Sequence, residues 1–420
     1  MSGRVLVFSI CCVIPLALTY FAAGHETVRN QIALSAGVVA FSMMAVNLFL
    51  ATRPALVEPM VGGLDRVYEL HKWIGISVIV LILIHTQLRF VQLEGVVAPG
   101  SLAETSVKVA EPAFYAMLIL LLVSAVKRLP RLPYEIPYHI WRQSHRLVGV
   151  VFLALVFHQY FVKAPFTAAD PVGWWLNMMA IIGVGSFLYT QFGAVLRRRA
   201  YRVTSVTKHV AATIVEAEPL GRGLSTRPGN FAFLSARRNG LREPHPFTVS
   251  GILPDGKIQF SIRGLGDYTR RLRDLLQEGD KLLLEGGYGQ FSYLRGGDLQ
   301  VWVAGGIGVT PFLAMADDLS PNEARQIVMV YCVRNRADAV GIERLEAAAA
   351  RSANFTLHLF ESDTAGRFDA AALLALVPFE MGRADLFFCG PGPMRTGLLD
   401  QLKAAGKTPA HVYFERFEFR

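Results

Sequence analysis

Four histidines lie in two long apolar segments of this 420-residue chain, where an imidazole is costly. The first segment holds His71 and His85, and the second holds His145 and His158. These spacings are nearly equal, so two parallel helices would hold the histidines at two levels roughly 20 Å apart. Paired imidazoles can ligate one haem iron from opposite sides. We therefore expect two haem b groups, one between His71 and His145 and one between His85 and His158.

A second interpretation is that the histidines only form hydrogen bonds between helices or lie at span ends. A lone histidine would favour that interpretation, whereas matched pairs in two parallel spans favour haem ligation. The angular positions differ between the pairs: His71 and His85 lie about 40° apart around a helix, but His145 and His158 lie about 140° apart. Helix tilt, helix distortion or a different rotation of the two haems would absorb this difference.

Six apolar segments have the length and composition of membrane spans. They are Val5–Ala23, Ile32–Ala51, His71–Val91, Pro112–Val126, His145–Val162 and Val172–Leu196. The first follows Arg4 as a signal peptide would. However, Ala22-Ala23-Gly24 is a poor cleavage site and another span follows at once, so we expect this span to be retained.

Basic residues are unevenly distributed among the loops. They concentrate after the second, fourth and sixth spans, at Arg53, Arg66, Lys127, Arg128, Arg131, Arg142 and Arg197–Arg199. Because basic loops stay on the cytoplasmic side, both ends of the membrane half are expected inside. His71 and His145 then lie near the inner face, and the chain after Tyr201 lies in the cytosol.

Composition separates the two halves of the chain. Hydrophobic residues make up 52% and charged residues 18%, which is unusual for a soluble protein. Residues 1–200 hold 16 Lys and Arg against 9 Asp and Glu, while residues 201–420 hold 26 against 24. The nearly neutral second half argues against nucleic acid as a partner. The four cysteines have neither metal-ligand spacing nor a disulfide framework.

The second half contains two patterns. Five short alternating runs between Arg202 and Gln300 predict a small antiparallel barrel with a helix near Tyr268–Leu276. From Val301, strands alternate with helices, which predicts a doubly wound parallel α/β sheet. The expected architecture is a six-helix transmembrane bundle at residues 1–199, an antiparallel β-barrel at 200–299 and an α/β domain at 300–420.

Two glycine-containing turns end predicted strands of the parallel sheet. Gly305-Gly306-Ile307-Gly308 precedes a helix that opens at Pro311, and Cys389-Gly390-Pro391 ends another strand. Glycines let backbone amides approach a pyrophosphate, and a helix N-terminus favours its negative charge. Tight packing alone would also explain either turn.

Six segments taken together indicate a function more specifically than either glycine turn alone. They are HPFTVSG (His245–Gly251), IRGLGDYT (Ile262–Thr269), GGIGVTPF (Gly305–Phe312), TAGRFD (Thr364–Asp369), CGP (Cys389–Pro391) and ERFEFR (Glu415–Arg420). Their order resembles that of ferredoxin-NADP-reductase-type modules. With the four membrane histidines, the chain resembles the NADPH oxidase and ferric reductase superfamily in its compact bacterial form, over roughly residues 30–420.

The resemblance implies roles for individual residues. FAD would contact His245, Pro246, Phe247, Thr248, Arg263 and Thr269, with His245 where related reductases often have arginine. The nicotinamide dinucleotide would contact Gly305, Gly306, Gly308, Thr310, Pro311, Arg367, Cys389, Gly390 and Pro391. Thr248, Cys389 and Phe417 would act at the reacting rings, with Phe417 shielding the flavin and Phe419 as a close competitor for that position.

Arg334 and Arg336 follow the second strand of the parallel sheet, where a 2′-phosphate would lie, so we expect NADPH in preference to NADH. The resemblance implies electron flow from NAD(P)H through FAD and two haems to an outer-face acceptor. Oxygen, giving superoxide, or a ferric complex is the expected acceptor, and the bacterial inner membrane the expected location. The alternative is a cytochrome that serves a partner protein or quinone. A channel or anchor would leave the flavin module unexplained.

Overall fold

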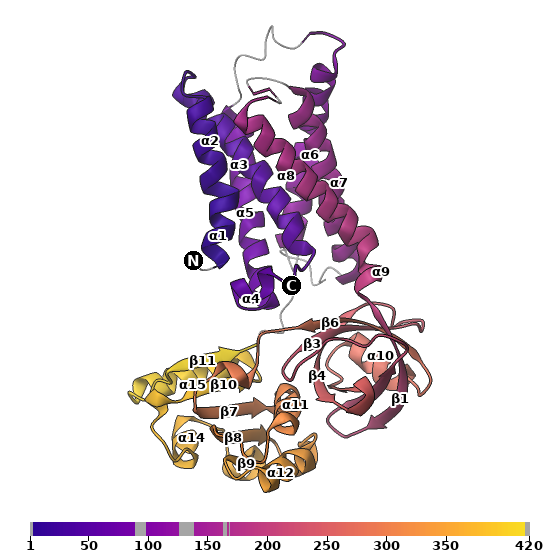
Figure 1. Ribbon diagram of the computed structural model, residues 1–420, viewed down its shortest axis with the longest axis vertical. Coiled ribbons are helices and arrows are strands. Elements are labelled where there is room, and N and C mark those ends of the chain that lie inside the picture. The colour runs from indigo at the N-terminus through magenta and orange to yellow at the C-terminus, as the bar shows by residue number, and fades with distance from the viewer. Residues whose placement is uncertain (1–2, 89–97, 126–137, 163–165, 168, 416–420) are drawn as a thin grey trace. The chain divides into compact units, whose positions relative to one another are not determined.

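The computed structural model describes residues 3–88, 98–125, 138–162, 166–167 and 169–415. The chain divides into two compact units, Met1–Val195 and Leu196–Arg420. The first unit is helical, and the second combines strands with helices (Figure 1). Phe417 and Phe419 lie outside the described residues, as do the basic loop residues Lys127, Arg128 and Arg131.

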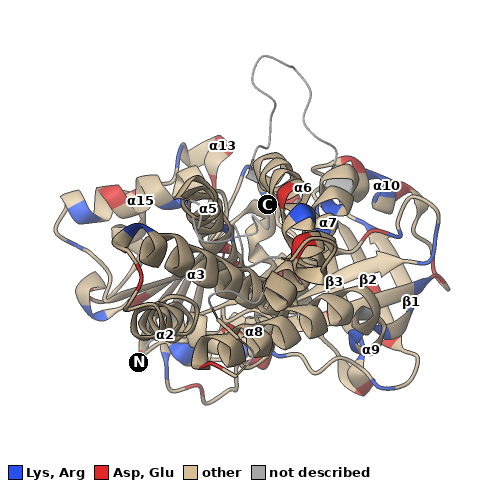
Figure 2. Cartoon of the chain, turned by 90° about the horizontal axis from the view of Figure 1, so that it is seen from above, with Lys and Arg blue, Asp and Glu red and all other residues tan. Residues whose placement is uncertain are grey.

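Within the described residues, six helices of the first unit are long and apolar enough to cross a bilayer, as predicted. They begin with α1 (Gly3–Phe8), which continues through a π-helical turn (Ser9–Val13) into α2 (Ile14–Ala22). The others are α3 (Val28–Ala51), α5 (Leu64–Leu88), α6 (Leu102–Ala125), α7 (Tyr138–Val162) and α8 (Pro171–Leu188). Short α4 (Val57–Val61) precedes α5, and a π-helical turn (Tyr189–Gly193) joins α8 to α9 (Ala194–Arg197). Charged side chains are sparse along α2, α3 and α8 (Figure 2).

Helix α3 is the most enclosed of the spans. It packs against α2, α5 and α8, while α6 packs against α7 (Figure 1). Phe41 of α3 stacks on Phe152 of α7 with ring centroids 5.0 Å apart. Trp175 of α8 donates its indole N–H to the Ser42 hydroxyl of α3 at 2.8 Å. Each histidine-bearing helix therefore has its own supporting neighbour, α3 for α5 and α6 for α7.

Three spans start seven to ten residues earlier than their apolar stretches predict. Helices α5, α6 and α7 begin at Leu64, Leu102 and Tyr138, ahead of the predicted starts at His71, Pro112 and His145. Backbone hydrogen bonds continue a helix through polar residues, which a hydropathy window leaves out. His71 and His145 consequently lie about two turns inside their helices rather than at the ends.

The barrel of the second unit is closed and antiparallel, which confirms the predicted class. Its strands are β1 (Arg199–Lys208), β2 (Thr213–Pro219), β3 (Phe231–Ala236), β4 (His245–Ile252), β5 (Ile258–Ile262) and β6 (Lys281–Tyr288), in the order β1-β2-β5-β4-β3-β6. Strand β1 is missing from the predicted runs. Only Tyr201 and Val203 of this strand are fully buried, so the alternation is short. Helix α10 (Asp267–Leu275) lies where the sequence predicts a helix.

The parallel sheet is doubly wound. Its strands are β7 (Leu299–Gly305), β8 (Gln326–Val333), β9 (Phe355–Glu361), β10 (Asp385–Cys389) and β11 (His411–Phe414), in the order β11-β10-β7-β8-β9. The chain therefore leaves β7 on one side through β8 and β9, and returns on the other side through β10 and β11. This reversal creates a crevice between β7 and β10, the place where such folds bind ligands.

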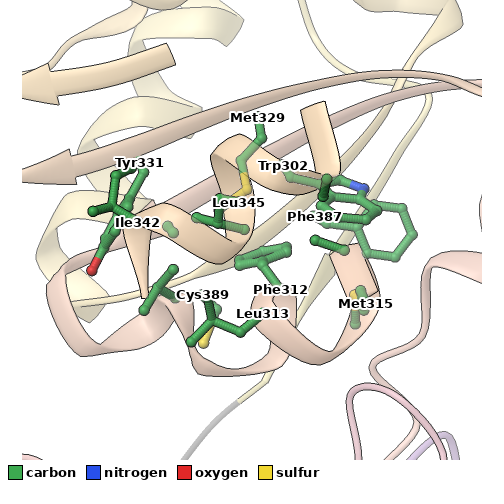
Figure 3. Close-up of a cluster of buried hydrophobic side chains, with 14 of the residues drawn as sticks. Trp302, Phe312, Leu313, Met315, Met329, Tyr331, Ile342, Leu345, Phe387 and Cys389 are labelled. Atoms are coloured by element: carbon green, nitrogen blue, oxygen red, sulfur yellow. The ribbon is translucent and has the colours of Figure 1, made fainter. Parts of the chain in front are cut away.

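Alternate residues of the central strands face opposite layers. Trp302 and Phe387 pack with α11 (Thr310–Asp318) and α12 (Ile342–Arg351) (Figure 3). Val301 and Leu386 pack with α14 (Ala370–Leu376) and α15 (Gly392–Ala404). Both faces are thus covered by helices, and short α13 (Ser362–Ala365) follows β9. The covered sheet fixes the carboxyl ends of its strands, where the glycine turns lie.

Candidate functional site

The structure brings together both predicted histidine pairs. His71 of α5 and His145 of α7 have ring centroids 5.9 Å apart at an interplanar angle of 65°. His85 and His158 lie within electrostatic range of each other. Among the described residues, no cluster of three or more His, Cys, Asp or Glu side chains could hold a metal ion. Haem iron needs only two protein ligands, so pairs of this kind are sufficient.

All four imidazoles form hydrogen bonds through Nδ1. His71 bonds to the Asn47 carbonyl at 3.2 Å and His85 to the Ala33 carbonyl at 2.8 Å, both on α3. His158 bonds to the Ser106 carbonyl of α6 at 3.2 Å. A carbonyl can only accept, so each of these Nδ1 atoms carries the hydrogen. The lone pair then lies on Nε2, the nitrogen available to a metal.

His145 reaches the same state through a side chain. Its Nδ1 lies 2.8 Å from the hydroxyl of Ser124, and that hydroxyl donates to the Leu120 carbonyl at 2.6 Å. Because its hydrogen is already used, Ser124 accepts from His145. Trp141 stacks on the His145 ring at 5.3 Å and 6°, and donates to the Ser124 carbonyl at 3.3 Å. Metal-bound histidines generally have such a partner on the second nitrogen, so the residues fit haem ligation.

The two glycine turns meet at the crevice between β7 and β10. A Cβ atom on Gly308 would stand 2.2 Å from the Cys389 carbonyl oxygen, and one on Gly305 would stand 2.8 Å from Pro391 Cδ. Only glycine allows this approach. Thr310 and Pro311 are buried beneath the turn at the start of α11, and the Thr310 hydroxyl donates to the Ile307 carbonyl at 3.2 Å. Two segments about eighty residues apart thus form one loop pair.

A cleft of about 730 Å³ lies between these turns and the barrel. This volume is within the range of small-molecule sites. Six predicted residues line it: Arg263, Gly305, Gly306, Arg334, Arg367 and Pro391. Arg270 and Arg273 of α10 add further positive charge, and Asp338 adds one carboxylate. The excess of arginine suits a ligand that carries several phosphates.

Arg334, Arg336 and Thr269 each have a partner within the protein. Arg334 forms an ion pair with Asp338 at 2.9 Å. Arg336, which does not line the cleft, pairs with Glu346 at 2.6 Å. The Thr269 hydroxyl accepts from the Gly266 amide at 2.9 Å and thereby caps α10. Asp338 was not predicted as a site residue. Its carboxylate joins the site only because it pairs with Arg334, which follows the end of β8.

The predicted flavin segment forms the first half of β4. His245 stacks on Tyr268 with ring centroids 3.8 Å apart, and Phe247 lies 6.4 Å from the same ring. Burial and the nearby carboxylate of Glu243 raise the pKa of Tyr268, so this phenol stays neutral. Thr248 is buried, and Pro246 pairs with Phe233 of β3.

Cys389 is fully buried at the end of β10. Burial, with the carboxylate of Glu415 as a second cause, raises the pKa of Cys389 well above its ordinary range. The side chain therefore remains a thiol at neutral pH. Glu415 was not among the predicted site residues, because nothing in the sequence brings it next to Cys389. The predicted flavin-shielding residues, Phe417 and Phe419, lie beyond the described residues.

Three protein families match successive parts of the chain. Residues 36–156 match the ferric reductase like transmembrane component, residues 211–305 an FAD-binding domain, and residues 302–399 an oxidoreductase NAD-binding domain. The first match covers His71, His85 and His145 and ends two residues before His158. The other two cover the barrel except β1, and the parallel sheet except β11.

Curated relatives match about half of the chain. The electron transfer component of toluate 1,2-dioxygenase from Pseudomonas putida is 29% identical over 225 residues, which are 51% of this chain and 65% of the relative. A probable electron transfer subunit of dihydroorotate dehydrogenase B from Methanothermobacter thermautotrophicus is 32% identical over 192 residues, 46% of this chain and 67% of the relative. The chain thus spans about two thirds of the length of these relatives.

A solved structure of flavohemoglobin from Malassezia yamatoensis, with bound FAD and heme, matches with a TM-score of 0.50 and 18% identity. The match covers 93% of this chain and 99% of that chain, and it shows a likeness of fold alone. The three family matches, in this order, form the architecture expected from the motifs. The chain belongs to the NADPH oxidase and ferric reductase superfamily.

Proposed function

We propose that this protein is an NAD(P)H-dependent oxidoreductase that moves electrons through FAD and two haem b groups across a membrane. The observation that carries the proposal is that one chain joins an arginine-lined dinucleotide cleft to two facing pairs of membrane histidines. We propose domain boundaries at residues 1–199, 200–299 and 300–420, and a bacterial inner-membrane location with the FAD and NAD(P)H domains in the cytoplasm.

When bound, FAD accepts hydride and releases electrons singly, and haem carries one electron at a time. The chain's own residues bind and orient these groups. Arg263, Arg334 and Arg367 balance phosphate charge in the cleft. Thr248, with a buried hydroxyl, and Cys389, with a buried thiol, would lie at the reacting rings. From the family resemblance, Phe417 would shield the flavin.

In the membrane unit, His71 and His145 would hold one haem and His85 and His158 the other, each through its Nε2 nitrogen. With both sides of each iron held by a histidine, the haems would carry electrons without binding an acceptor at iron, so an acceptor would react at the outer face. We propose oxygen, giving superoxide, or a ferric complex as that acceptor. Transfer to a partner protein or quinone is the alternative.

Anaerobic reduction distinguishes these functions. NADPH or NADH should reduce both haems of the purified protein, and addition of oxygen should reoxidise them with formation of superoxide. Reoxidation by a ferric chelate but not by oxygen would assign a ferric reductase. Haems that react only with a quinone would support the carrier function, and haems that stay oxidised would reject electron transfer from the nucleotide.

The outer pair can be tested by itself. His85→Ala should remove the low-spin bis-histidine signal of one haem and retain most of the other. His25→Ala is a matched control, because that histidine is exposed and lies near Glu26, outside both pairs. Two unaltered haem signals in His85→Ala would contradict the pairing.

A further inference from the structure

One arginine of the nucleotide domain reaches into the barrel. Arg344 of α12 donates from Nη1 to Gln259 Oε1 at 2.6 Å and from Nη2 to the Ser250 carbonyl at 2.8 Å. Its Nη2 also pairs with the carboxylate of Asp317. The guanidinium thereby joins β4 and β5 of the barrel to α11 and α12 of the parallel sheet.

The joined elements are those that carry the proposed chemistry. Strand β4 carries His245–Thr248, two residues before the Ser250 carbonyl. Helix α11 begins at Thr310, directly after the glycine turn of the nucleotide site, and it packs against β4. Arg344 therefore links the proposed flavin segment of β4 to the proposed nucleotide turn before α11, through its own hydrogen bonds and ion pair and a few residues of chain.

The barrel is locally shaped to receive this guanidinium. A bulge interrupts the β4–β5 pairing between Val249 and Gly251, so Ser250 is left without a partner residue in the ladder. The hydroxyl of Ser250 bonds to the Gln259 carbonyl at 3.1 Å. A Cβ on Gly251 would stand 3.1 Å from Arg344 Nη2 and 3.3 Å from Gln259 Cβ. The last glycine of the HPFTVSG segment thus gives room to Arg344.

We propose that Arg344 is a positioning residue that sets the separation between the flavin and the nicotinamide. A guanidinium is planar and always charged, and its several N–H groups can hold three acceptors in fixed directions. A lysine has the charge but not the geometry. Hydride transfer depends steeply on the distance between the reacting atoms. Loss of the Arg344 contacts should therefore slow hydride transfer, while FAD and the nucleotide both stay bound. The inference rests on the proposed function.

The test compares two arginines on the same helix in the full-length protein with FAD bound. Arg351 also lies on α12, but its Nη2 donates to carbonyls of the nucleotide domain, the shortest being Ala316 at 2.9 Å. Arg344→Ala and Arg344→Lys should slow flavin reduction at saturating NADPH by about tenfold or more, with nucleotide affinity and flavin content retained. Arg351→Ala should leave that rate nearly unchanged.

The readout is stopped-flow flavin reduction, with the long-wavelength charge-transfer absorbance of the flavin–nucleotide complex as a spectroscopic measure of ring contact. Equal rates in Arg344→Lys and the wild type would overturn the proposal, as would equal slowing in Arg351→Ala. If Arg344→Ala does not keep flavin, Gln259→Leu removes one barrel partner and should lower the same absorbance. A wild-type flavin that neither NADPH nor NADH reduces would reject the proposed function itself.

Discussion

At the scale of single residues, Ser124 differs from the other partners of the histidines. His71, His85 and His158 bond to backbone carbonyls, which no substitution removes, whereas His145 depends on a hydroxyl. Ser124→Ala should weaken haem binding at the inner pair by roughly 10- to 100-fold. Haem content and the two midpoint potentials of the purified protein measure this effect.

Two variants control for the change in Ser124. Ser124→Thr retains the hydroxyl and should restore the inner haem. Ser144→Ala removes a hydroxyl next to His145 in sequence that donates to the Trp141 carbonyl at 2.9 Å instead. Unchanged midpoint potentials for both haems in Ser124→Ala would argue that the hydrogen bond has no role in ligation.

Nucleotide choice is also decided by single residues. Arg334 lines the cleft and is paired with Asp338, so a 2′-phosphate must compete with that carboxylate. We expect Arg334→Ala to lower kcat/KM for NADPH by about tenfold relative to NADH, which corresponds to about 1.4 kcal/mol. Arg336→Ala is the control, because Arg336 pairs with Glu346 instead. If the wild type had equal kcat/KM for NADPH and NADH, and Arg334→Ala did not change these values, Arg334 would have no role in nucleotide specificity.

Residue type and spacing were sufficient to find the histidines and the glycine turns. Histidine in hydrocarbon and glycine before a helix are unusual enough to stand out in one sequence. Ser124, Asp338 and Arg344 could not be found in this way. Serine, aspartate and arginine are common, and their roles depend on neighbours 21, 4 and 85 residues away along the chain.

At the scale of elements, the sequence predicted the six spans, the barrel and the doubly wound sheet. It placed the starts of α5, α6 and α7 too late. A hydropathy window detects only apolar side chains, whereas backbone hydrogen bonds extend these helices through polar residues. It missed β1, in which only two residues are fully buried. The first error affects helix ends, and the second a whole strand whose side-chain alternation is weak.

The contact between the β7 and β10 ends gives an element-scale prediction. Gly308→Ala places a Cβ where only 2.2 Å separates it from the Cys389 carbonyl oxygen, so the two strand ends must move apart. Overpacking of this kind typically costs about 1–3 kcal/mol. Flavin reduction by NADPH should become much slower, and thermal unfolding should begin earlier.

Gly392→Ala is the matched control for Gly308→Ala. A Cβ on Gly392 meets no atom within 4 Å, although this residue directly follows Cys389–Pro391, the segment that Gly308 contacts. Its nucleotide affinity and melting temperature should therefore match the wild type. Similar behaviour of both variants would mean that the loop adjusts without cost.

At the scale of the whole molecule, the basic loops predict on which side the nucleotide acts. Arg53, Arg66 and Arg197–Arg199 belong to loops expected on the inner face. NADPH added to inverted membrane vesicles should therefore reduce the flavin, whereas sealed right-side-out vesicles should respond only after detergent is added. Reduction in intact right-side-out vesicles would reverse the proposed orientation.

The order of strands in the parallel sheet has a consequence for synthesis on the ribosome. Strand β7 can pair with β8 as soon as β8 is synthesised, but its other neighbour, β10, is synthesised about eighty residues after β7. A nascent chain that already contains the spans, the barrel and three strands still lacks Cys389–Pro391, one wall of the nucleotide crevice. During translation the membrane half would therefore be inserted before the chain can draw electrons from the cytosol. A nascent chain that lacks this wall would then accept no electrons from the nucleotide and could not pass them to an unintended acceptor.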